Sequence, residues 1–193
     1  MAALPLDVQQ AIRRQAPKAL KAASKKEVDK KFKRIKNEMI KEFLSLPVTQ
    51  ELMQGADGVN ISGTLNGVTN LFAFIGFDRG EQPILPIIQV LEDTKIQFHK
   101  NTKNPIGHIY NVYLPTPQQI FEITPMPWAT GRSWAQGIER GISGLGFLLR
   151  KNNRGRSGAA IQSRVKVRGG RFRNTVYISA FIKKYKKRFE ELE

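Results

Sequence analysis

Apolar side chains recur three or four residues apart between positions 28 and 46, which is the period of one face of an α-helix. The sequence Ser24-Lys25-Lys26-Glu27 is a capping box and predicts that this helix starts there. Pro47 predicts its end. A separate short helix is expected over residues 4–14, because Pro17 should interrupt the helical pattern. The apolar stripe of the long helix consists of Val28, Phe32, Ile35, Met39, Phe43 and Leu46.

The middle of the chain predicts short elements separated by loops. Residues 49–54 fit one more helical segment, and residues 57–70, rich in Gly, Asn, Ser and Thr, predict a loop. The apolar run 71–77 predicts a short buried strand or an apolar plug. Residues 83–93 predict a helix that begins near a proline, with its isoleucines on one side.

Alternation of polar and apolar residues then predicts two paired strands, at 95–99 and 108–114. A further strand is expected at 120–123, in a stretch that prolines punctuate. Ser133 is placed to cap a helix that runs to about position 143.

The last quarter of the chain predicts a basic β-hairpin arm and a helix. Runs at 145–150 and 160–167 flank a polar, glycine-containing loop at 152–158, so they predict an arm within about 145–175. The final helix is indicated by five apolar residues on one face: Ile178, Phe181, Ile182, Tyr185 and Phe189.

These elements predict an α+β fold, with a mixed or antiparallel sheet flanked by helices. We expect a basic helical region at 1–46 and an α+β core at 47–193 that carries the arm and the C-terminal helix, joined in one domain. In the expected core, the stripe of the long helix packs against strands that contain Phe72, Phe74, Ile109, Val112, Ile161 and Val165.

The composition is that of a chain able to fold around its own core. It has 193 residues, of which 40% are hydrophobic and 25% are charged. The lack of cysteine excludes disulfides and thiolate metal sites. No run of 18 apolar residues and no signal-peptide core is present. We therefore expect no membrane contact and a first site of action in a cytosol-like compartment.

The unusual property is charge, because 32 Lys and Arg against 16 Asp and Glu give a net charge of +16. Residues 18–41 hold ten basic and three acidic residues, whereas residues 42–139 hold nine acidic and five basic ones. Residues 140–188 hold fifteen basic residues and no acidic residue. Unlike charged regions on one chain favour self-association or docking of a partner over simple solubility.

Catalytic chemistry is poorly represented. His99 and His108 lie on or beside expected strands, where a surface role is the common one. The sequence Gly141-Ile-Ser-Gly-Leu145 matches a nucleophile elbow only in part, and neither a dinucleotide fingerprint nor a phosphate-binding loop occurs. The acidic residues lack the close pairs that two-metal chemistry uses. We expect no enzyme activity, no catalytic or metal-binding residue and no cofactor.

The cations of the expected arm and of the loop after it are candidates for contact with DNA phosphates or with a neighbouring subunit. Only Phe172 lies among them as a base-stacking residue, so duplex contact without base selectivity is favoured over single-strand recognition. A solvated basic face and docking onto an acidic protein are the alternatives. The candidates are Arg150, Lys151, Arg154, Arg156, Arg164, Lys166, Arg168, Arg171 and Arg173.

Two stretches rich in glycine and aromatic residues, 60–77 and 125–134, are candidates for subunit packing. Aromatic residues and Arg are enriched in interface cores, although packing inside the domain is the alternative. The candidates are Ser62, Thr64, Leu65, Phe72, Phe74, Phe77, Trp128, Arg132 and Trp134.

Five motifs, between residues 40 and 182, carry a resemblance to a known class of protein. They are Pro47-Val-Thr-Gln-Glu51, Ser62-Gly-Thr-Leu65, Asn70-Leu-Phe-Ala-Phe-Ile-Gly-Phe77, Pro127-Trp-Ala-Thr-Gly-Arg-Ser-Trp134 and Ile138-Glu-Arg-Gly-Ile-Ser-Gly-Leu-Gly146. In this combination and order the chain resembles virion structural proteins of tailed bacteriophages, namely the neck or tail-completion proteins of the head–tail junction.

The resemblance implies an α+β subunit of a homo-oligomeric ring, six-fold or twelve-fold, in the virion and assembled in the host cytoplasm. Its neighbours would be portal, adaptor or tail proteins, with non-specific contact to the double-stranded DNA in the channel. A neck ring and a tail-terminator ring are both compatible with these motifs. The alternative function is a sequence-independent nucleic-acid-binding protein associated with the ribosome or the nucleoid.

Overall fold

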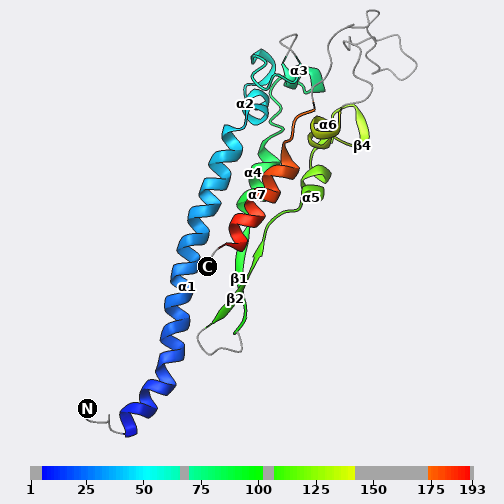
Figure 1. Ribbon diagram of the computed structural model, residues 1–193. Coiled ribbons are helices and arrows are strands. Elements are labelled where there is room, and N and C mark those ends of the chain that lie inside the picture. The colour runs from blue at the N-terminus through cyan, green and yellow to red at the C-terminus, as the bar shows by residue number, and fades with distance from the viewer. Residues whose placement is uncertain (1–5, 66–69, 102–106, 142–173, 192–193) are drawn as a thin grey trace, which may run out of the picture.

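The computed structural model describes residues 6–65, 70–101, 107–141 and 174–191, and the side chains of the first helix from position 19 onward (Figure 1). One long helix runs the length of the molecule, and the other elements are arranged along it. In chain order the elements are α1 (Leu6–Ser45), α2 (Pro47–Met53), the 3-10 turn η1 (Gly55–Asp57), α3 (Leu71–Ile75), α4 (Leu85–Glu92), β1 (Lys95–Asn101), β2 (His108–Tyr113), α5 (Pro117–Glu122), β3 (Pro125–Met126), β4 (Ala129–Ser133), α6 (Trp134–Arg140) and α7 (Ile178–Glu190).

The helix α1 is a single element of 40 residues, so the expected break at Pro17 and the expected start at Ser24 are wrong. Proline removes only one backbone donor, and the alanines and lysines on both sides of it are strong helix formers. A helix that is already propagating through position 24 needs no cap there, so the capping-box sequence lies inside it.

The apolar seam between α1 and α7 confirms both predicted stripes. Phe32, Ile35, Met39 and Phe43 of α1 are buried, and so are all five apolar residues predicted for α7. The Phe32 and Phe189 ring centroids lie 5.5 Å apart, and those of Phe43 and Phe181 lie 5.6 Å apart. The two helices therefore run antiparallel, and the last helix of the chain lies along the upper half of the first (Figure 1).

Two segments expected as strands are helices instead. Residues 71–75 form α3 because the Asn70 side chain accepts a hydrogen bond from the Ala73 N–H, and Gly76 ends the helix in the left-handed conformation. Residues 117–122 form α5 because Thr116 and Gln119 make a complete capping box around Pro117. Both runs are too short for apolar content alone to distinguish a strand from a helix.

The other expected helices are confirmed to within three residues. The segment predicted at 49–54 is α2, which starts on Pro47, and the one predicted at 83–93 is α4. Ser133 caps α6 as expected, by accepting a hydrogen bond from the Gln136 N–H, although α6 ends at Arg140.

The described strands form two small antiparallel sheets, β1–β2 and β3–β4. The pair β1–β2 confirms the predicted strands, and Ile96 lies opposite Val112. The expected core is wrong in part, because Phe72 reaches the core from a helix and Ile109 is 36% exposed. The basic arm, with Ile161 and Val165, lies outside the described residues.

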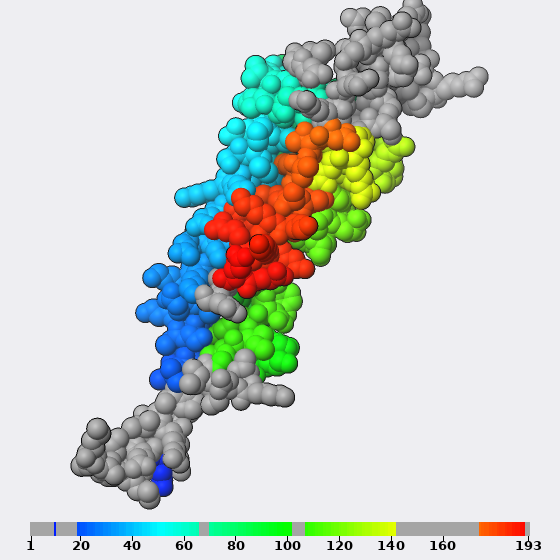
Figure 2. Space-filling view, in the orientation of Figure 1, coloured from blue at the N-terminus to red at the C-terminus, as the bar shows by residue number. Residues whose placement is uncertain are grey.

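The fold class is therefore α+β, with more helix and less sheet than expected. The molecule is elongated, and Figure 2 shows α1 as its long margin. Among the described residues no helix combines the length and the apolarity needed to cross a membrane.

We expect Phe43→Ala to lower the free energy of unfolding by about 3–5 kcal/mol, because it leaves a cavity where α1, α2 and α7 meet. The Phe43 side chain is 0% exposed and stacks near Tyr177. Leu20→Ala, at a side chain of the same helix that is 45% exposed, should cost less than about 1 kcal/mol. Urea unfolding of both variants tests this. An equal decrease in the free energy of unfolding of the two variants would contradict the role of Phe43 in the packing of α1 on α7.

Candidate functional site

The carboxylate of Glu51 holds together the loop that links α2 to α3. Its side chain is 0% exposed. One oxygen accepts hydrogen bonds from Asn60 Nδ2 at 2.9 Å and from the Leu71 N–H at 2.6 Å, and the other accepts from the Ser62 N–H at 2.8 Å. A buried carboxylate is stable when several donors satisfy it, and these three come from separate parts of the loop.

The side chain of Asn70 completes this arrangement, which we call the Glu51 cluster (Glu51, Asn60, Ser62, Asn70 and Leu71). Its amide nitrogen lies 2.8 Å from the carbonyl oxygens of Ala56 and Gly58 and 3.2 Å from that of Gly55. Three of the motifs behind the phage resemblance, those beginning at Pro47, Ser62 and Asn70, therefore meet in one hydrogen-bonded unit at one end of the molecule (Figure 1).

Most of the residues proposed for subunit packing point into the subunit itself. Thr64, Leu65, Phe72 and Trp134 are buried, whereas Ser62, Phe74 and Phe77 are partly buried. A neighbouring subunit has no access to the buried members in this conformation. These buried residues pack inside the domain, which was the alternative to subunit packing.

Trp128 and Arg132 are the two members of that set that are exposed. The Trp128 side chain is 40% exposed, yet its indole N–H donates to the Ile75 carbonyl at 2.7 Å. A side chain on Gly76 would lie 3.1 Å from the same indole ring, so Gly76 lets the β3–β4 turn approach α3. These two residues are the part of the set that remains open to a partner.

The nine cations proposed for DNA or subunit contact, from Arg150 to Arg173, lie outside the described residues, as does Ser143. His99 is exposed on β1, and His108 Nδ1 lies 3.1 Å from Asn101 Oδ1 across the β1–β2 pair. Within the described ranges no group of three His, Asp or Glu side chains is arranged to hold a metal ion.

An open groove of about 840 Å³ runs between α1, β2 and the end of α7. All of β2 and Leu114 line it, so it follows the strand lengthwise. The remaining lining residues are Ser24, Glu27, Val28 and Lys31 of α1, Ile96 of β1, and Lys186, Phe189 and Glu190 of α7. Apolar and charged side chains of both signs alternate along it.

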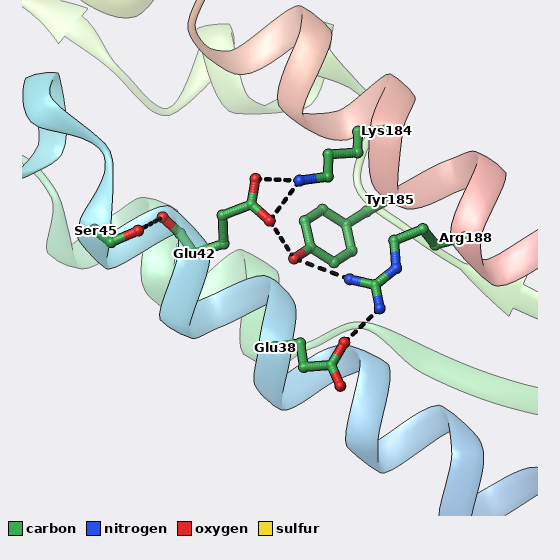
Figure 3. A network of polar contacts seen from close by, with 6 residues as sticks. All are labelled: Glu38, Glu42, Ser45, Lys184, Tyr185 and Arg188. Atoms are coloured by element: carbon green, nitrogen blue, oxygen red, sulfur yellow. Dashed lines mark hydrogen bonds and ion pairs between the residues drawn. The ribbon is translucent and has the colours of Figure 1, made fainter.

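A polar network above this groove holds α7 in register on α1 (Figure 3). Lys184 Nζ lies 2.7 Å from both Glu42 oxygens, and the Tyr185 hydroxyl donates to Glu42 at 2.8 Å. Arg188 contacts Glu38 one turn further along. The hydrogen bond from Lys184 lowers the pKa of Glu42, and burial, followed by the bond to Glu42, raises the pKa of Tyr185 to about 12. Tyr185 therefore stays a hydrogen-bond donor at neutral pH.

The first turn of α7 is held by two further contacts. Glu139 of α6 accepts hydrogen bonds from the Ser179 N–H and hydroxyl, both at 2.5 Å. A carboxylate at this position also suits the positive end of the helix dipole. The buried hydroxyls of Thr49 and Tyr177 lie 2.8 Å apart and join α2 to the residue before α7.

Comparison of the chain with protein-family models, with curated proteins and with solved structures finds no match.

Sequence reasoning did not single out Glu51, Glu42 or Glu139 as organising residues. One signal was present, because Glu51 is the single charged residue in a helical segment whose other members are apolar or neutral. The partners of these carboxylates are backbone amides and distant side chains, which a spacing rule does not reveal.

We expect Glu51→Gln to lower the free energy of unfolding by about 1–3 kcal/mol, because the amide group of Gln would face a backbone N–H that needs an acceptor. Hydrogen exchange should show faster exchange at the amides of Ser62 and Leu71. The neighbouring exposed Gln50→Glu is the matched control and should leave those amides protected. Unchanged exchange in the Glu51 variant would contradict this role.

We expect the stabilising effect of Glu42 to depend on pH. Because its pKa is lowered in the folded state from 4.5, its stabilisation is present above that value and is lost as pH falls through the folded-state pKa. By urea unfolding, Glu42→Gln should therefore be less stable than the original protein at pH 7, and this difference should shrink as pH falls through the folded-state pKa of Glu42. Lys184→Met should follow the same pattern, and the double variant should add little. A stability gap independent of pH would disprove the electrostatic contact.

Proposed function

We propose that this chain is a structural subunit of a homo-oligomeric ring at the head–tail junction of a tailed bacteriophage, of the neck or tail-completion class. In this proposal the ring is six-fold or twelve-fold, surrounds the DNA channel and binds portal, adaptor or tail proteins. The observation that carries the proposal is that the β1–β2 hairpin has unpaired strand edges and exposed apolar side chains among the described residues.

This hairpin lies along the lower half of α1, and within the described residues its two outer edges pair with no other strand (Figure 1). Its exposed face carries Ile109, Asn111 and Tyr113 of β2, which also border the groove, with Ile109 36% and Tyr113 49% exposed. On β1 the exposed Lys95 and Gln97 lie opposite Tyr113 and Asn111. Two-stranded hairpins are marginally stable alone, and open strand edges invite pairing with another chain. A neighbouring subunit that covers this face would bury apolar surface and satisfy the edge.

The Glu51 cluster supports a structural role for the motifs that carry the resemblance. The carboxylate and the amides of this cluster bind one another and the backbone, so they shape a loop. An assembly protein needs such a rigid end to present a defined surface to the next ring. The exposed Trp128 and Arg132 beside it are suited to a contact of this kind.

The elongated shape and the unlike charged regions also favour a ring. A subunit whose contacting surfaces differ joins its neighbours head to tail, and such contacts close into a ring when the rotation allows. The alternative, a free nucleic-acid-binding protein, would bind duplexes as a monomer.

We expect the purified chain to form a discrete oligomer at micromolar concentration, measured by light scattering after size exclusion and by native mass spectrometry. Ile109→Lys with Tyr113→Lys should shift it to monomer, because two charges are then buried without partners. Val59→Lys with Val176→Lys changes two exposed apolar side chains elsewhere and should leave the oligomer intact. A monomer at all concentrations, or equal loss in both double variants, would rule out this interface.

A further inference from the structure

The outer face of α1 carries a row of cations that packing does not require. Lys26, Lys30, Lys33, Arg34 and Lys41, which we call the α1 cation row, are all exposed. At 3.6 residues per turn they lie on the side of the helix opposite the buried Phe32, Ile35, Met39 and Phe43. Figure 2 shows α1 at the margin of the molecule, so this face is directed away from the other elements.

The spacing within the row is unfavourable for an isolated helix. Lys26, Lys30 and Arg34 are successively four residues apart, and like charges at that spacing repel one another. Arg34 lies 3.9 Å from Glu38, which also pairs with Arg188. The four lysines of the row form no ion pair with any described side chain.

Three of the five cations of α7 are paired within the fold. Lys184 is neutralised by Glu42, Arg188 by Glu38, and Lys187 lies 3.8 Å from Glu191. The four lysines of the α1 cation row have no such carboxylate among the described residues, so they are available to an external anion.

The chemistry of the row selects the class of anion. Between positions 26 and 41, Asn37 is the only other residue on the face of α1 that carries the row, so this face offers no aromatic or large apolar anchor. Protein interfaces are depleted in Lys and depend on such anchors, whereas lysines bind phosphates as point charges. The row is about 22 Å long at 1.5 Å per residue. A duplex presents about a dozen phosphates over that length.

We propose that the α1 cation row binds the phosphate backbone of double-stranded DNA without base selectivity. These residues are different from those of the basic arm that the sequence predicts at 145–175. The inference rests on the charges of α1 and not on the ring, but if the proposed function holds, it identifies a face of the subunit that contacts the DNA.

The test is fluorescence anisotropy of a labelled 20-base-pair duplex with the full chain, titrated between about 50 and 300 mM salt. The row variant changes Lys26, Lys30, Lys33 and Lys41 to Gln. The control variant, with the same loss of charge, changes four exposed lysines elsewhere: Lys95, Lys100, Lys183 and Lys186. Gln is nearly as good a helix former as Lys, so far-UV circular dichroism and thermal unfolding should show both variants folded.

The row variant should lose about 0.9 of the log–log salt slope for each phosphate contact removed, and at least about tenfold in affinity at 100 mM salt. The control should lose less than one unit of slope. Equal losses of affinity and of salt slope in both variants would show that only the net charge matters, and would overturn the proposal. So would unchanged binding in the row variant, or binding only to phosphatidylserine vesicles. Light scattering on the same samples reports ring assembly separately, so either proposal can fail alone.

Discussion

The antiparallel seam between α1 and α7 is the contact on which the rest of the structure depends. It joins residues about 140 positions apart, and the intervening elements are arranged along the pair (Figure 1). Aromatic rings fill the seam, and Glu42, Lys184 and Tyr185 fix its register from the side. Apolar burial supplies most of the stabilisation, whereas the polar network selects one alignment of two helices that could otherwise slide.

Three carboxylates hold neighbouring elements together through hydrogen bonds. Glu51 holds the α2–α3 loop, Glu139 holds the start of α7, and Glu42 holds its middle. Three of the nine acidic residues of the middle region are used in this way, whereas the other six, Asp57, Asp78, Glu81, Glu92, Asp93 and Glu122, are exposed. Among the described residues, Lys26, Lys30, Lys33 and Lys41 of α1 are exposed.

Within the described residues two exposed surfaces have no partner, and they differ in chemistry. The exposed face of β1–β2 presents Ile109 and Tyr113 among polar side chains, together with open strand edges, which suit another protein. The outer face of α1 presents lysines without apolar anchors, which suit phosphate. A subunit that contacts its neighbours through one surface and DNA through another is consistent with assembly around a DNA channel.

Periodic patterns determined the long elements, because a helix or strand that buries one face must repeat apolar residues along it. On that basis alone the sequence specified the part of α1 from position 24 onward, α7, the β1–β2 pair and the α+β class, but not the continuation of α1 through Pro17. It did not specify α3 and α5, because an apolar run of a few residues shows no period that distinguishes a helix from a strand. In these two segments the caps at Asn70 and Thr116 determine that a helix forms. The tertiary structure alone decided which candidate side chains are enclosed, as for Trp134, and which carboxylates meet their distant partners. Burial and pairing depend on residues that are remote in the chain, and local spacing carries no information about them.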